Sequence, residues 1–282
     1  MERSREVALR PRQWPWAVLL CRWSDAPEEP RPPDLYEALF TRSGAGGVVD
    51  YWQQVTYGTL DLTGSRVFGW LPMSHGTAEI AEIADLTFPG DRARLAAWGR
   101  EAAHVAGIDL TPYRSVLVVQ NRGPDHGATA SGDVVIVHTD PGLCEFGFIC
   151  HEMGRGFGLP HSYAHPDIGY GDGWDLMSFA STTFQCPIAF RGASGAATVG
   201  LNAHNLLRLD VIDPSRRWTL AHPDVSATVV LDPLNQPAIG SRGALVLELL
   251  PSATRPARPD GSTWTSSSTN GPDGTRPSRP MR

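Results

Sequence analysis

The sequence lacks the features of a membrane-spanning or nucleic-acid-binding protein. Its longest uninterrupted apolar run, at 16–21, is far shorter than the roughly 20 residues that a membrane-spanning helix needs. No run of lysines and arginines stands out, and the formal net charge is −6. Neither a membrane span nor a nucleic-acid partner is therefore predicted.

Cysteine is also scarce. The four cysteines are Cys21, Cys144, Cys150 and Cys186, and their spacing fits neither a dense disulfide framework nor a paired Cys-x-x-Cys zinc site. We expect buried free thiols. In an oxidising compartment, a bridge from Cys150 to either Cys144 or Cys186 is the alternative.

A secretory signal is not predicted at the start of the chain. Arginines precede the apolar run at 16–21, but Pro15 stands directly before it, Arg22 and Asp25 end it, and no small-residue cleavage site follows. We expect a strand buried on both faces here. The compartment stays open between the cytoplasm and non-classical export.

The composition predicts one large domain with a small addition. The chain of 282 residues has 41% apolar residues and nine tryptophans, enough for a substantial core. We expect a main domain over 1–215 and a partial β-rich appendage over 216–250. The segment 251–282 is rich in Pro, Ser, Thr, Arg and Gly, so we expect a disordered tail.

Apolar spacing predicts alternating strands and helices. Strands are expected at 16–21, 60–73, 115–120 and 133–138, helices at 34–41, 48–58, 91–106, 142–156 and 200–209, and three short strand-like runs after 218. Asp34 should cap the first helix, and the long third helix should bury Leu95, Trp98, Ala102 and Val105. This order predicts an α/β (α+β) fold with a twisted mixed sheet and a long helix against it.

The stretch at 150–162, CHEMGRGFGLPHS, carries the strongest functional signal. It matches the string H-E-x-x-H-x-x-G-x-x-H at His151, Glu152, Gly158 and His161. In that string, two histidines four apart share one helix face, and a third reaches the same metal ion after a glycine turn. The second histidine position holds Arg155, whose protonated guanidinium has no lone pair to offer a metal.

This string resembles that of the metzincin zinc peptidases, and in particular the immune-inhibitor-A-type proteases. Met177 stands where the methionine-containing turn of that family is expected, and 48–70 is similar to the segment ahead of its long helix. The resemblance covers 16–209. It implies a metzincin-like catalytic domain with an active-site helix, a Zn²⁺ cofactor, a protein or peptide substrate and a monomeric chain. By position, it implies His151 and His161 as zinc ligands, Glu152 as general base and Met177 in the turn.

Two functions are consistent with Arg155. The first is a zinc endopeptidase that hydrolyses peptide bonds with metal-activated water, impaired because one ligand is missing. The alternative is an inactive pseudo-peptidase that acts as a binding protein. Arg155 is expected to pair with Glu152, three residues earlier on the same helix. A third interpretation is a recent or erroneous change at this position, since His and Arg codons can differ by one base.

Other residues near the motif have structural interpretations. His126, His138 and His165 are candidates to replace the missing ligand, but none lies at the motif spacing. We expect each of them to be an ordinary surface or core histidine. Asp172 and Asp175 are predicted to cap turns rather than to bind calcium.

Overall fold

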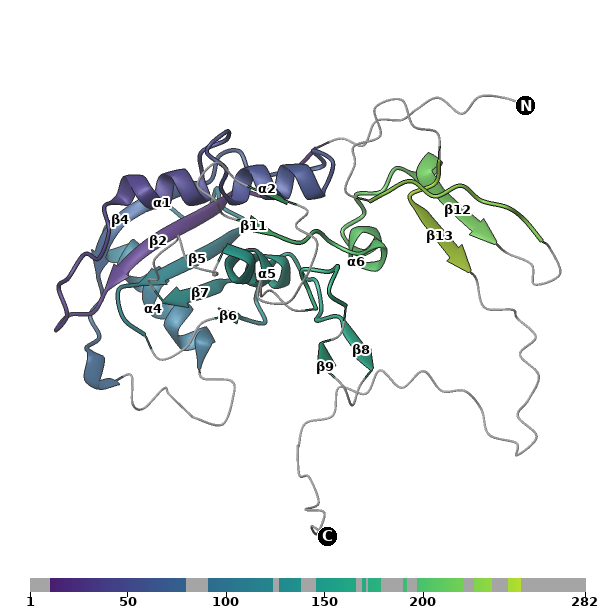
Figure 1. The fold of residues 1–282 in the computed structure, drawn as a ribbon. Helices are drawn as coiled ribbons and strands as arrows, with labels where there is room; N and C mark the ends of the chain where they lie inside the picture. The colour runs from purple at the N-terminus through teal and green to yellow at the C-terminus, as the bar shows by residue number, and fades with distance from the viewer. Residues whose placement is uncertain are drawn as a thin grey trace, which may run out of the picture.

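The structure is a computed structural model that describes residues 11–79, 91–123, 127–137, 146–165, 169–170, 172–178, 190–191, 197–220, 226–234 and 243–249. The predictions made for the tail at 251–282, for Cys144 and Cys186, and for His126 and His138 fall outside these ranges. The described residues form a mixed sheet with helices on both faces (Figure 1).

The central sheet has five strands in the order β4-β2-β5-β7-β6. Their bounds are Arg66–Pro72 for β4, Trp16–Arg22 for β2, Ser115–Gln120 for β5, Val134–Val137 for β7 and Gly127–Ala128 for β6. The first four are parallel to one another, and β6 pairs antiparallel with β7. The prediction of an α/β fold with a mixed sheet is confirmed.

Successive side chains of the strands point to opposite faces, and each face is covered by different helices. On one face Val18 and Val119 belong to a core cluster that includes α1 (Pro33–Phe40), α2 (Val48–Val55) and α5 (Phe146–Gly156). On the other face Leu19 and Val118 pack with α4, Arg92–Val105. The strand predicted at 16–21 is buried on both faces, as expected.

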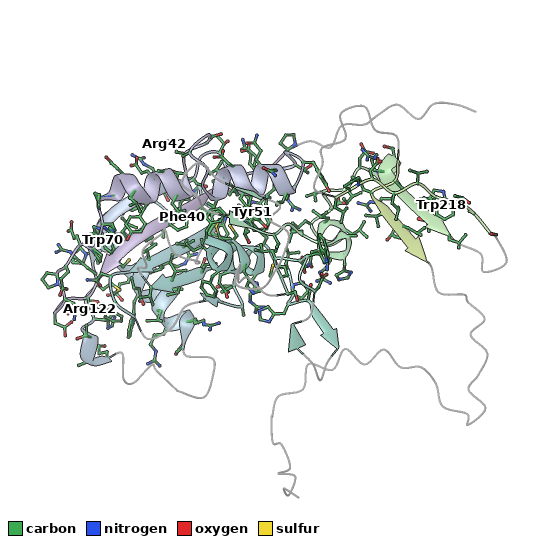
Figure 2. All side chains as sticks on the ribbon, in the orientation of Figure 1. Phe40, Arg42, Tyr51, Trp70, Arg122 and Trp218 are labelled. Carbon is green, nitrogen blue, oxygen red and sulfur yellow. The ribbon has the colours of Figure 1, made fainter. Side chains whose placement is uncertain are left out.

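Aromatic rings fill the space between the sheet and the helices α1 and α2. Phe40 and Tyr51 lie in this layer (Figure 2). The ring of Phe157, just after α5, packs edge-on against Trp52 with centroids 4.7 Å apart and against Trp16 at 5.5 Å. These contacts join α5 to both α2 and the interior strand β2, which positions the motif-bearing helix on the sheet.

The structure corrects several predicted helix details. Asp34 does not cap α1, because the helix begins one residue earlier at Pro33, whose fixed φ suits the first helical position. The helix α2 ends at Val55 rather than near residue 58. Val105 is 78% exposed. At about 100° per residue it falls outside the buried stripe of α4, which is formed by Leu95, Gly99, Ala102 and Ala103.

The remaining elements are short. They are β1 Arg12–Gln13 paired with β3 Leu60–Asp61, η1 Thr77–Glu79, β8 Tyr163–His165 paired with β9 Gly169–Tyr170, β10 Phe190–Arg191 paired with β11 Ala197–Thr198, α6 Ala203–Arg208 and η2 Pro214–Arg216. None of the helices in the described part of the chain combines the length and the apolar character that crossing a bilayer requires.

The β-rich end of the chain forms a two-stranded parallel sheet beyond α6 (Figure 1). It consists of β12, Arg217–Leu220, and β13, Val246–Leu249. The middle of the three predicted runs makes an isolated bridge from Leu231 to Ala244 and no strand within the described residues. Val246 is buried in the main core cluster, so this sheet packs onto the domain.

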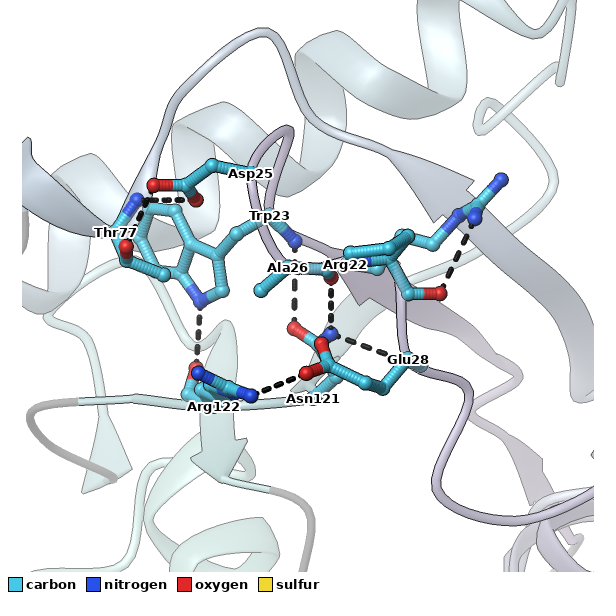
Figure 3. A network of polar contacts seen from close by, with 9 residues as sticks. Arg22, Trp23, Asp25, Ala26, Glu28, Thr77, Asn121 and Arg122 are labelled. Atoms are coloured by element: carbon cyan, nitrogen blue, oxygen red, sulfur yellow. Dashed lines mark hydrogen bonds and ion pairs between the residues drawn. The ribbon is translucent and has the colours of Figure 1, made fainter.

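A polar network closes the carboxyl end of the sheet between β2 and β5 (Figure 3). The amide of Asn121 accepts a hydrogen bond from the backbone of Trp23 at 3.3 Å and donates to the carbonyls of Ala26 at 2.7 Å and Glu28 at 2.9 Å. In open α/β sheets this is the place where small-molecule ligands bind, at the point where connections leave in opposite directions. Here the loop after β2 occupies it.

Candidate active site

The helix α5 ends in a glycine turn that redirects the chain. The N–H of Gly158 donates to the carbonyl of Arg155 at 2.8 Å, and the N–H of Leu159 donates to that of Gly154 at 3.0 Å. This pair of bonds requires Gly158 to adopt the left-handed backbone conformation, which costs glycine little because it has no Cβ atom. Gly158 has a φ of 89°, as its place in the motif predicts. The turn returns the chain toward His151.

The two histidines of the motif lie side by side. The ring centroids of His151 and His161 are 5.1 Å apart. Burial lowers the pKa of His151, and burial together with the charge of Arg155 lowers the pKa of His161 to about 4. Both imidazoles are therefore neutral at pH 7, the state in which histidine can act as a metal ligand.

The orientation of His151 is set by the segment around Met177. Nδ1 of His151 donates a hydrogen bond of 2.8 Å to the carbonyl oxygen of Leu176. Because a carbonyl can only accept, the proton of the neutral ring is on Nδ1 and the lone pair is on Nε2. This type of bond from the second ring nitrogen is common in metal-ligating histidines.

Met177 packs against α5 at Gly154, where a larger residue would collide with its sulfur atom. A Cβ atom at Gly154 would lie 2.6 Å from Sδ of Met177, closer than real side-chain contacts. Met177 itself is fully buried. The structure therefore places the predicted methionine directly under the helix turn that carries Glu152 and Arg155.

A buried polar cluster links this segment to the loop of His161. Oδ2 of Asp175 accepts a hydrogen bond from Nδ2 of Asn205 at 2.8 Å, and the same Nδ2 lies 3.0 Å from Oγ of Ser162. The N–H of Ser162 donates to the carbonyl of Met177 at 2.8 Å. We call Ser162, Asp175 and Asn205 the Asn205 clamp.

The sequence did not predict the Asn205 clamp. Asp172 caps its own turn, as predicted, by accepting from the N–H of Trp174 at 3.0 Å. Asp175 instead accepts hydrogen bonds from the α6 region, including one of 3.0 Å from the N–H of Asn202. The only sequence signal for this region is a capping residue before α6, where Oδ1 of Asn202 accepts from the N–H of Asn205 at 2.9 Å.

Glu152 is held by two partners. Its side chain is 9% exposed, and Oε2 accepts a hydrogen bond of 2.8 Å from the backbone N–H of Ala128 on β6. Nε of Arg155 lies 3.8 Å from the same oxygen. The expected pair between Arg155 and Glu152 is thus present, as an ion pair longer than a hydrogen bond.

The donor set does not fit a three-histidine zinc site. Two neutral imidazoles are available, but the third position brings the guanidinium of Arg155, which cannot ligate and repels a cation. Within the described residues, no group of three or more His, Cys, Asp or Glu side chains is placed so that it could hold a metal ion.

Comparison with known proteins gives little further guidance. No family model and no curated protein matches the chain. Wild-type OgpA from Akkermansia muciniphila, solved in two crystal forms, aligns with 74% of this chain at 15% identity, with TM-scores of 0.45 and 0.44. The chain spans 63% of the length of these structures.

Proposed function

We propose that this chain is a peptidase-type domain with an impaired catalytic centre, whose substrate or ligand is a protein or peptide. In this proposal His151 and His161 correspond to two of three zinc ligands, Glu152 to the general base and Met177 to the methionine of the turn. Arg155 takes the place of the remaining ligand. The pairing of Arg155 with Glu152 at 3.8 Å is the observation that carries the proposal.

Arg155 opposes catalysis in two ways. It removes one of three neutral ligands and adds a positive charge, which at about 4 Å and an effective dielectric near 20 costs several kcal/mol against a cation. It also lies beside Oε2 of Glu152, the oxygen that already accepts from Ala128, so this oxygen of the would-be base has two partners of its own. A zinc ion held by three imidazoles would supply activated water, and we derive no hydrolytic step with the present donor set.

The test is to restore the histidine. Arg155→His should give a chain that binds about one zinc ion and hydrolyses casein, while the unaltered chain should retain little zinc and cleave little. Adding Glu152→Gln to Arg155→His should keep the zinc and abolish cleavage, because the base is lost and the ligands are not. Zinc is measured by mass spectrometry of the purified, dialysed protein.

A matched control places a histidine elsewhere. Arg208→His, at the exposed end of α6, should change neither zinc content nor cleavage. Unchanged zinc content in Arg155→His would contradict the proposed site. Chelator-sensitive cleavage of casein by the unaltered chain would contradict the proposed impairment.

A second function is that of a binding protein. What favours it is that the parts of the site remain organised although one ligand is missing. His151 is still oriented by the carbonyl of Leu176, and Glu152 by the N–H of Ala128. Peptide binding without cleavage by the unaltered chain would support this function, and absence of any peptide binding would contradict it.

A further inference from the structure

Arg155 differs from Arg100 and Arg216 in its hydrogen bonds. Arg100 binds both oxygens of Asp133 at 2.8 and 2.7 Å, and Arg216 donates to Asp232 at 2.7 Å. Arg155 has a side chain 30% exposed and donates no hydrogen bond within the described part of the chain. The contact with Glu152 at 3.8 Å is too long for a hydrogen bond, so within the described residues the N–H donors of the guanidinium have no protein acceptor and face solvent.

These donors lie beside the two imidazoles of the candidate active site. Arg155 follows His151 by four residues on α5, so the two side chains share one face of the helix, and the ring centroids of His151 and His161 lie 5.1 Å apart. A metal ion at this place in a peptidase would attract a carbonyl or carboxylate oxygen of the bound peptide. Arg155 provides a positive charge here with several N–H donors.

We propose that Arg155 is a carboxylate receptor, which binds a peptide through a carboxylate at the place where a peptidase of this type holds its metal. The proposal rests on the site assigned in the proposed function. The planar guanidinium matches a carboxylate with two parallel N–H···O bonds, a geometry that lysine cannot reproduce. The carboxylate comes either from the C-terminus of a peptide or from an Asp or Glu side chain.

Glu152 opposes this binding in a predictable way. Its carboxylate is anchored by the N–H of Ala128 and stays within 3.8 Å of Arg155, so it repels an incoming carboxylate. Replacing it by the uncharged Glu152→Gln removes the repulsion and leaves an oxygen to accept from Ala128. The proposal therefore requires that Glu152→Gln binds the ligand more tightly than the unaltered chain.

The experiment measures the fluorescence anisotropy of a dansyl-labelled pentapeptide of Ala, Leu and Ser with a free C-terminus, titrated with the full chain at low salt. We expect saturable binding, about tenfold weaker in Arg155→Gln and about fivefold tighter in Glu152→Gln. Arg155→Lys should fall between the unaltered chain and Arg155→Gln. The exposed control Arg208→Gln should bind like the unaltered chain.

Two further peptides identify the source of the carboxylate. Amidation of the C-terminus should abolish binding, and an amidated peptide with one internal Asp shows whether a side-chain carboxylate restores it. Restored binding supports a receptor for any carboxylate, and its absence supports a receptor for C-termini. Equal binding of the amidated and free peptides, or binding unaffected by Arg155→Gln in a folded variant, would overturn the proposal.

Arg155→His separates this proposal from the proposed function. Loss of peptide binding without a gain of zinc would contradict the three-ligand site and leave the carboxylate receptor standing. A gain of zinc, together with no carboxylate-dependent binding by the unaltered chain, would contradict the receptor alone. Circular dichroism of each variant confirms that the chain is folded.

Discussion

The side-chain amide of Asn205 donates a hydrogen bond of 2.8 Å to Oδ2 of Asp175, and its nitrogen also lies 3.0 Å from Oγ of Ser162. Asp175 precedes Leu176, whose carbonyl orients His151, and Ser162 follows His161. One buried side chain on α6 thus ties together the segments that position both histidines of the motif.

Asn205→Ala should lower the free energy of unfolding by about 1–3 kcal/mol, because the buried carboxylate of Asp175 loses a hydrogen-bond donor. Urea titration followed by circular dichroism measures the change. His204→Ala, an exposed neighbour on the same helix, should change it by less than about 0.5 kcal/mol. Equal effects of the two substitutions would mean that the Asn205 clamp does not stabilise the fold.

Gly154→Ala should destabilise the chain by about 1–3 kcal/mol, since its Cβ would lie 2.6 Å from Sδ of Met177 and one of them must move. The matched control is Gly69→Ala on β4, where a Cβ meets nothing within 4 Å. Thermal melts of the two variants should differ clearly. A Gly154→Ala variant with the melting temperature of the control would show that Met177 is not tightly packed under α5.

The thiols of Cys21 and Cys150 should resist alkylation in the folded chain. Both are free and buried, as predicted, and burial raises the pKa of Cys21 to about 12 and that of Cys150 well above its usual range. At pH 8 only about one in ten thousand Cys21 thiols is then a thiolate, the reactive form. Iodoacetamide labelling mapped by mass spectrometry should modify both cysteines in guanidinium chloride and neither without it.

The fold should lose stability as the pH rises above about 9. Burial raises the pKa values of Cys21 and Tyr57 to about 12 in the folded chain, while the unfolded groups ionise near 8.5 and 10. Between these values the unfolded chain binds fewer protons than the folded chain, so the free energy of unfolding falls with increasing pH. Cys21→Ala should reduce the pH slope of the free energy of unfolding between pH 9 and 12. The reduction should correspond to a difference of up to about one bound proton between the folded and unfolded chain. An identical pH slope in the variant would contradict the assignment.

Much of the fold follows from patterns that act over short distances in the chain. The apolar run at 16–21 was predicted to be a buried strand, and it forms β2, an interior strand of the sheet. The sequence also predicted that the helix ends in a turn at Gly158 and that Arg155 pairs with Glu152, since both join residues within a turn or two of one helix. Val105 was misassigned because the predicted apolar stripe included it, whereas the buried side of α4 is turned toward Gly99 and Ala103.

The surroundings of the motif were decided only by the tertiary structure. The hydrogen bonds from Ala128 to Glu152, from His151 to Leu176 and from Asn205 to Asp175 join residues 24, 25 and 30 positions apart. No periodicity encodes such pairs, because they depend on how the sheet, α5 and α6 are packed. The sequence alone determined which side chains the motif contains and that Arg155 interrupts it. The packed fold determined that the N–H of Ala128 anchors Glu152. It also determined that the guanidinium of Arg155 meets no hydrogen-bond acceptor within the described residues.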